Sequence, residues 1–228
     1  MQDKPEMKLE SVEHSGERGS MKLVVLGATG GTGLEIVRQA TERGHSVTAL
    51  VRSPERLKPF GDRIRVKRGD LLNRTDLEQA IQGHDAVISG FGPRVPVSKA
   101  DAHLLEQFAS ALTAAMQHTN VRRAVIESVA FLFKNAIFPP AYLLGRLFFP
   151  QIVADASAME GVFAESGLDW TIVRPPELTE KPYRGKYRVR EGQLPRFGFK
   201  ISRADVANFM LNVAEDRSSI RKVFGVSN

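Results

Sequence analysis

The chain has 228 residues, of which 42% are hydrophobic and 25% charged, with no cysteine and a formal net charge of +6. The length fits one sizeable domain, and the composition is that of an ordinary soluble globular protein. The lack of cysteine excludes disulfides and thiolate metal ligands, and the five histidines show no ligand spacing, so we expect no metal site. Basic residues alternate with acidic ones over most of the chain, which argues against nucleic acid as the partner.

The chain has one strongly polar segment, at its N-terminus, and one strongly apolar segment, at residues 131–150. Residues 1–20 are polar and rich in glutamate, and we expect a disordered tail there. The longest apolar region, residues 131–150, is interrupted by proline and charged residues, so it is a poor membrane span. No secretory signal is visible. We therefore expect a cytoplasmic protein, a monomer or homodimer, with one folded domain over residues 21–228.

From residue 21 onward, short β-branched runs alternate with amphipathic stretches, a pattern typical of βαβ units around a parallel sheet. The expected strands, in chain order, are residues 22–26, 46–51, 64–67, 85–89, 121–127, 169–173, 187–190 and 222–226. The expected helices are residues 31–43, 75–81, 100–118, 152–166 and 202–215. The pattern predicts an α/β fold, a Rossmann-type doubly wound parallel sheet in a single domain.

A glycine-rich segment, GATGGTG, follows the first strand, and a helix begins inside it. A strand before and a helix after are the context that a dinucleotide-binding fingerprint requires. Gly27 allows the tight turn, Gly30 lets the backbone approach a pyrophosphate, and Gly33 permits close packing of the helix on the sheet. The helix N-terminus then attracts the phosphates, and threonine hydroxyls add donors. The candidate pyrophosphate-binding residues are Gly27, Thr29, Gly30, Gly31, Thr32 and Gly33.

The end of the second strand indicates which cofactor is bound. An NAD-preferring site places an acid there for the ribose 2′-hydroxyl, whereas this chain reads VRSPER. Arg52 can form a bidentate contact with a 2′-phosphate, and Arg56 shares its face if the segment is helical. The alternative is a pair of solvated surface arginines. The missing acid and the two arginines favour NADP(H).

Two further strand ends carry candidate ligand-binding residues. Asp70 ends the third strand, where its carboxylate either accepts a hydrogen bond from the adenine amino group or caps the following helix. The fourth strand ends in Ser89-Gly90-Phe91-Gly92. Glycines at the carboxyl end of a central strand suit close passage of a ligand, since ligands of open α/β sheets lie at that edge.

Five segments together resemble the atypical short-chain dehydrogenases of the NmrA-like type, most closely the biliverdin reductase B group of NADPH flavin reductases. They are GATGGTG, VRSPER, GDLL, ESGLDWTIVRPPELTE (165–180) and ISRADVANFML (201–211). The resemblance runs from about residue 21 to the C-terminus and implies NADP(H) as cofactor, with the glycine motif on the pyrophosphate and the arginines on the 2′-phosphate. It further implies adenine contacts from Asp70 and Leu71, an adenosine and ribose lining of Gly90, Phe91 and Gly92, Ser128 as catalytic candidate beside the nicotinamide, and a carboxamide frame of Pro175, Pro176 and Glu177.

The chain departs from relatives that carry a strong acid or base. A Tyr-x-x-x-Lys pair is absent, since Arg146 stands four residues after Tyr142 and the other tyrosines, Tyr183 and Tyr187, lie beyond the sixth strand. Residues 155–160 lack the lysine of many NmrA-like reductases. The Thr-Ser pair of the biliverdin reductase B group appears here as Ser128-Val129. Such a site suits hydride transfer to an electron-poor acceptor, with water supplying the proton and the cofactor carrying the chemistry.

Two functions of different classes follow. The first is an NADPH-dependent reductase of a flavin, a tetrapyrrole or a similar planar acceptor, with substrate-side segments at 129–165 and 175–200. The aromatics of 131–150 either wall the acceptor, pack in the core or form a dimer contact. Ser128 either donates a hydrogen bond in the site or caps a backbone group. The second function is a non-catalytic NADP(H)-binding regulator of NmrA type; an isomerase or epimerase is disfavoured by the missing Tyr/Lys pair.

Overall fold

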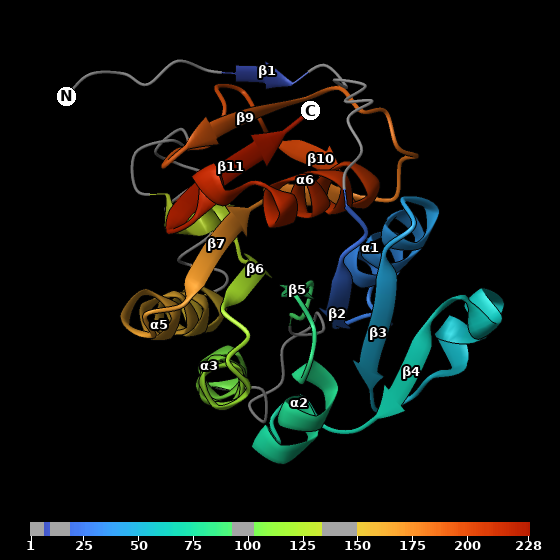
Figure 1. The fold of residues 1–228 in the computed structure, drawn as a ribbon. Coiled ribbons are helices and arrows are strands. Elements are labelled where there is room, and N and C mark those ends of the chain that lie inside the picture. Colours follow the sequence, from blue (N-terminus) through green and yellow to red (C-terminus); the bar gives the residue numbers. More distant parts are fainter. Residues whose placement is uncertain (1–6, 10–18, 93–102, 134–149) are drawn as a thin grey trace.

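The structure, a computed structural model, describes residues 7–9, 19–92, 103–133 and 150–228, and Figure 1 shows their arrangement. The main sheet has the strand order β1-β9-β11-β7-β6-β5-β2-β3-β4. Neighbours from β11 to β4 run parallel, whereas β9 is antiparallel to β11 and β1 is antiparallel to β9. The strands are β1 (Met7–Leu9), β2 (Lys22–Leu26), β3 (Ser46–Val51), β4 (Arg65–Arg68), β5 (Ala86–Ser89), β6 (Arg123–Glu127), β7 (Asp169–Arg174), β9 (Tyr187–Glu191) and β11 (Lys222–Ser227). This order confirms the predicted Rossmann-type sheet.

Helices cover both faces of the sheet, as Figure 1 shows. One face carries α1 (Gly31–Glu42) and α6 (Arg203–Glu215). The other face carries α2 (Arg74–Ile81), α3 (Leu104–Thr119) and α5 (Pro150–Glu165). Short 3₁₀ helices are η1 (Glu55–Arg63), η3 (Ala130–Leu132) and η4 (Arg217–Ser219), and β8 (Glu177–Thr179) pairs in parallel with β10 (Lys200–Ser202).

The central strands are apolar on both faces because helices bury both sides of the sheet. In β2, Leu23 and Val25 join the cluster under α1 and α6, whereas Val24 and Leu26 join the cluster under α3 and α5. All four side chains are fully buried. Successive residues of a strand point to opposite faces, so a parallel strand between two helical layers needs an unbroken apolar run.

The helix ends depend on local and long-range partners. Gly44, at φ +79°, ends α1 in the left-handed conformation, and Asn73 caps α2 through its side-chain oxygen. The N-terminus of α3 is capped from another helix, because the carboxylate of Asp155 in α5 accepts from the backbone N–H of Leu105 and Glu106 at 2.9 and 3.0 Å. The sequence indicates Gly44 as the end of α1 and Asn73 or Thr75 as the cap of α2, but it gives no sign of a cap that lies 50 residues away.

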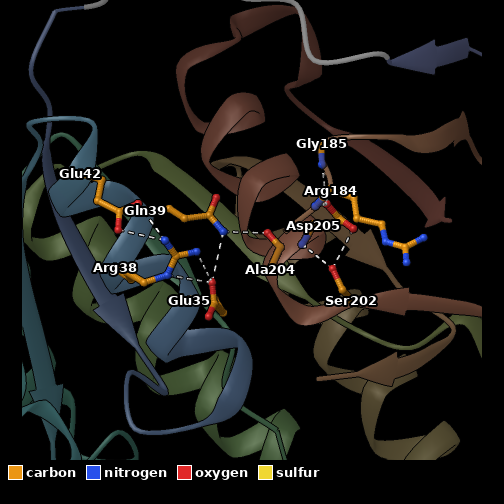
Figure 2. A network of polar contacts seen from close by, with 9 residues as sticks. All are labelled: Glu35, Arg38, Gln39, Glu42, Arg184, Gly185, Ser202, Ala204 and Asp205. Carbon is orange, nitrogen blue, oxygen red and sulfur yellow. Dashed lines mark hydrogen bonds and ion pairs between the residues drawn. The ribbon is translucent and has the colours of Figure 1, made fainter. Parts of the chain in front are cut away.

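A buried carboxylate, Asp205, organises the start of α6 (Figure 2). Ser202 caps the helix, since its hydroxyl accepts from the Asp205 N–H at 3.0 Å and donates to the Asp205 carboxylate at 2.7 Å. The other carboxylate oxygen accepts from the backbone N–H of Arg184 and Gly185. Asn228 adds a fourth donor at 3.0 Å. The fully buried carboxylate therefore ties α6 to the loop before β9 and to the C-terminal residue.

Most predicted elements are present with ends shifted by one or two residues, and β4 lies at the sheet edge, as its charged residues predict. The strand β1 was not anticipated, since it lies inside the segment expected to be disordered and pairs with β9. Three residues without a turn signal give too short a pattern to recognise. Residues 134–149 lie outside the described part, so the predictions on their aromatics and on Tyr142 stay untested.

Candidate functional site

The turn between β2 and α1 has the conformation that its glycines allow. Gly27 has φ +70°, and its carbonyl accepts from the Gly30 N–H at 2.8 Å. A Cβ on Gly27 would lie 2.7 Å from the backbone nitrogen of Phe91. A Cβ on Gly33 would overlap the Gly27 carbonyl oxygen and lie 2.8 Å from the Ala28 Cα. The turn therefore tolerates no side chain at these two positions.

The first turn of α1 leaves its backbone N–H groups without a capping side chain. The N-cap residue is Gly30, which offers no side chain, and the first turn contains no acidic residue. Such a helix end carries a partial positive charge and favours an anion. Together with the tight glycine turn, it forms a cradle that fits a dinucleotide pyrophosphate.

The two predicted arginines, Arg52 and Arg56, differ in their hydrogen-bond partners. Arg52 follows β3, is exposed, and has no polar partner within the described residues. Arg56 lies in η1, and its guanidinium donates to the Thr29 carbonyl at 2.5 Å. Because the helix begins only at Glu55, the two arginines do not share a helical face. Arg56 braces the glycine turn, whereas Arg52 leaves its donors open for a ligand.

Asp70 and Leu71 follow the carboxyl end of β4, on the same side of the sheet as the glycine turn. The Asp70 carboxylate accepts from the Leu72 N–H at 3.0 Å and so closes its own turn, while the cap of α2 is Asn73. Leu71 is 8% exposed and packs in the core. The helix-cap alternative for Asp70 is thus replaced by a turn-closing role, and its contact with adenine stays a prediction.

The residues after β5 lie directly beside the glycine turn. A Cβ on Gly90 would be 3.2 Å from the Gly33 nitrogen, so the two chain segments touch through backbone. Phe91 packs its ring on Phe108 at 4.8 Å, whereas a Cβ on Gly92 would meet no atom within 4 Å. Since β2 pairs with both β3 and β5, this contact marks the point where the strand order reverses, which is where open α/β sheets bind ligands.

Ser128, the catalytic candidate, is 7% exposed and stands just after β6. Its hydroxyl donates to the carboxylate of Glu160 at 2.5 Å, and Arg174 holds that carboxylate with two hydrogen bonds at 2.9 and 2.5 Å. The Arg174 guanidinium lies 4.7 Å from the centre of the Phe133 ring. The one proton of Ser128 is therefore engaged by a buried ion pair, which sequence reasoning did not identify.

The residues Pro175, Pro176 and Glu177 continue from β7 along the same edge. The Pro175 carbonyl accepts from the Ala130 N–H at 3.0 Å, which fixes the segment against η3. Glu177 is exposed and forms an ion pair with Lys200 at 3.0 Å. Because β2 to β7 run parallel, the predicted site residues, which follow the carboxyl ends of these strands, lie at one end of the strands.

Two charged residues at the glycine turn were not predicted. Glu127, the last residue of β6, accepts from the Thr32 hydroxyl at 3.2 Å, and Arg203, the first residue of α6, donates to the same hydroxyl at 3.3 Å. Burial raises the pKa of Glu127 from its ordinary 4.5 to about 7, while the Thr32 hydrogen bond and the charge of Arg203 oppose the rise. These contacts span 95 and 171 residues, so no local pattern could reveal them.

A cavity of about 820 Å³ opens at the amino ends of the parallel strands, opposite the glycine turn, and its lining includes Arg122, Asp169 and Glu215. None of the predicted site residues lines it. The buried Arg123 beside it donates to the backbone carbonyls of Val213, Ala214 and Asp169, so its guanidinium serves the fold. The cofactor site is therefore assigned from the glycine turn and not from the size of this cavity.

The sequence profile of the family described as NAD(P)H-binding matches residues 27–217, which is most of the chain and begins at the first glycine of the turn. The chain belongs to this NAD(P)H-binding family. Its cofactor is accordingly a nicotinamide dinucleotide, and the cradle at the start of α1 has the features that a phosphate site of such a cofactor requires. The match confirms that the chain is an NAD(P)H-binding protein, as the resemblance to atypical short-chain dehydrogenases implied.

Three known proteins are similar to this NAD(P)H-binding protein, one in sequence and two in fold. An uncharacterised chloroplastic protein of Arabidopsis thaliana is 32% identical over 226 residues, covering 95% of this chain and 80% of the relative. A short-chain dehydrogenase/reductase of Veillonella parvula, solved in complex with NADP, has a TM-score of 0.77 at 20% identity and covers 92% of this chain and 95% of its own. ChuY, an anaerobilin reductase of Escherichia coli O157:H7, has a TM-score of 0.73 at 19% identity, and the match covers 90% of this chain and 96% of ChuY. The two structures share the fold.

The expected cytoplasmic location stays a prediction, and the Arabidopsis relative is chloroplastic. Among the described residues, no helix combines the length and the apolar character needed to cross a lipid bilayer.

Proposed function

We propose that this protein is an NADPH-dependent reductase that transfers hydride to a flavin, a tetrapyrrole or a similar conjugated acceptor. The observation that carries the proposal is the contrast between the two ends of the site. The dinucleotide end has an uncapped helix N-terminus at the glycine turn and the exposed Arg52 after the neighbouring strand β3, whereas the Ser128 hydroxyl donates its proton to Glu160. Ser128 is thus held in place by an ion pair and is not poised to deliver its proton to a substrate, which favours an acceptor that takes its proton from water.

The residues divide the work accordingly. The bound nicotinamide would supply the hydride, which is the chemistry of the cofactor itself. The glycine turn and Arg52 would hold the phosphates, and Pro175 and Pro176 would orient the reacting ring through backbone groups. A conjugated acceptor is already electron-poor, so water can supply its proton. The name of ChuY, an anaerobilin reductase of the same fold, is compatible with an acceptor of this class.

The proposal is tested by the absorbance of NADPH when the purified protein is mixed with excess FMN, with NADH and biliverdin as parallel arms. Consumption of NADPH above the protein-free control supports the reductase. If NADPH binds but neither acceptor increases its consumption, the reductase proposal for these acceptors fails and the non-catalytic regulator becomes the better account.

Replacing Arg52 by alanine is expected to weaken NADPH binding about tenfold or more, because a hydrogen bond to a charged group contributes roughly 1.5–3 kcal/mol. NADH lacks the 2′-phosphate, so its affinity should not change. Fluorescence titration with both nucleotides checks this. Arg122→Ala, at the opposite edge of the sheet, is the matched control for loss of one positive charge. Equal effects on NADPH and NADH would contradict the assignment of Arg52.

Replacing Ser128 by alanine is expected to lower kcat for NADPH oxidation by less than tenfold. A general acid or base contributes about 10²- to 10⁴-fold, but the Ser128 proton is already donated to Glu160. The pH profile of kcat should keep its shape. A loss of 100-fold or more, restored by Ser128→Thr, would instead make Ser128 the proton donor.

A further inference from the structure

The guanidinium of Arg203 lies on the glycine turn from outside the predicted motif. A Cβ on Gly31 would be 2.5 Å from the Arg203 Cδ, so the arginine stem crosses directly over this residue. One terminal nitrogen donates to the Thr32 hydroxyl at 3.3 Å, and the Nε donates to the Glu180 carboxylate at 2.7 Å. Ser202, which caps α6, fixes the backbone from which this side chain extends. A positive charge is thus already present at the N-terminus of α1.

Glu127 places a carboxyl group beside the same turn. It accepts from the Thr32 hydroxyl, and a Cβ on Gly90 would lie 3.3 Å from its other oxygen. Its neighbours from α1 and from the segment after β5, Thr32 and Gly90, are therefore uncharged. The charged group that faces Glu127 is Arg203 from α6, which in turn forms an ion pair with Glu180. Removal from water disfavours the ionised carboxyl, and the single cation does not fully compensate.

The two groups act in opposite directions on an anion placed on the turn. The guanidinium attracts a phosphate, as does the helix N-terminus. An ionised Glu127 repels it across the Thr32 hydroxyl, whereas a protonated Glu127 does not. A second negative charge beside a carboxyl group also favours its protonated form.

We propose that Arg203 is a pyrophosphate-binding residue of this site and that Glu127 takes up a proton from solvent when the dinucleotide binds. The inference rests on the placement of the dinucleotide on the glycine turn. Arg203 releases Thr32 or Glu180 and contacts the pyrophosphate. Glu127 becomes the uncharged partner of the Thr32 hydroxyl. The affinity for NADP(H) then falls as the pH rises, because above a pH of about 7 binding must first protonate Glu127.

Calorimetric titration with NADP⁺ tests the role of Glu127. The wild-type protein should take up protons on binding at pH 8, measured from the heat in two buffers of different ionisation enthalpy. Glu127→Gln keeps the shape of the side chain but should lose this uptake and bind NADP⁺ about tenfold more tightly at pH 8, which lies about one unit above the pKa of Glu127. The 2′-phosphate of the ligand also titrates near pH 6, but it contributes equally to both proteins. The difference in proton uptake between the wild type and the variant therefore reports on Glu127 alone. Equal proton uptake by both proteins would overturn the role of Glu127.

Arg203→Gln tests the pyrophosphate contact separately. The variant should bind NADP⁺ about tenfold more weakly, whereas adenosine 2′-monophosphate, which lacks the pyrophosphate, should bind it as it binds the wild type. Arg122→Gln controls for the change in net charge, and a thermal melt verifies the fold. Unchanged NADP⁺ affinity, or an equal loss for both ligands, would overturn the role of Arg203. If Gly33→Ala binds NADP⁺ as well as the wild type, the placement on the turn itself is wrong.

Discussion

NADP(H) binding is expected to fall by at least 100-fold when Gly33 is replaced by alanine. The added Cβ would overlap the Gly27 carbonyl oxygen and approach the Ala28 Cα to 2.8 Å, and both are backbone atoms that cannot rotate away. The turn would have to open, and the first N–H groups of α1 would lose their alignment toward the phosphates. Fluorescence titration with NADPH measures the change.

A second glycine supplies the matched control for this substitution. Gly161 lies within α5, is exposed, and has no atom within 4 Å of an added Cβ. Gly161→Ala should leave NADPH binding unchanged and raise the free energy of unfolding by about 0.5–1 kcal/mol, since alanine is the better helix former. If Gly33→Ala stays folded and binds NADPH with wild-type affinity, the close approach of the turn to the helix is not what the cofactor requires.

Replacing Asp205 by alanine is expected to lower the free energy of unfolding by about 3–5 kcal/mol, because several buried donors lose a charged acceptor at once. The carboxylate is fully buried and accepts from Arg184, Gly185 and Ser202 (Figure 2). It also accepts from the side-chain amide of Asn228. Chemical denaturation of the cofactor-free protein gives the change directly.

Asp216 provides the comparison for this second prediction. It is exposed and caps η4 by accepting from the Ser218 N–H at 2.8 Å. Asp216→Ala should therefore lower the free energy of unfolding by only about 1 kcal/mol, the usual effect of losing a cap. Equal losses in the two variants would show that the buried network at Asp205 contributes no more than a surface cap.

The strand and helix pattern was predictable because it is local. The run Leu23–Leu26 is apolar at every position, and Gly27, Gly30 and Gly33 follow at the spacing that a tight strand-to-helix turn needs. Each of these features is contained within a dozen residues. The sheet order then follows from the rules for parallel βαβ units and not from any further sequence signal.

The polar connections were not predictable because they join distant parts of the chain. Ser128 was identified as a site residue, but its bond to Glu160 depends on how α5 lies against β6. The run Ser202–Asp205 has the pattern of a capping box, whereas the contacts of Asp205 to Arg184 and Asn228 require the completed fold. In each case the residue was visible in the sequence, and its partner was set by tertiary packing.

The most direct test of the whole account is the affinity of the wild-type protein for NADP⁺ and for NAD⁺, measured by calorimetry in one buffer. The glycine cradle and the open Arg52 together predict that both nucleotides bind and that NADP⁺ binds at least tenfold more tightly. Equal affinities would contradict the assignment of the 2′-phosphate to Arg52. No binding of either nucleotide would contradict the cofactor site itself.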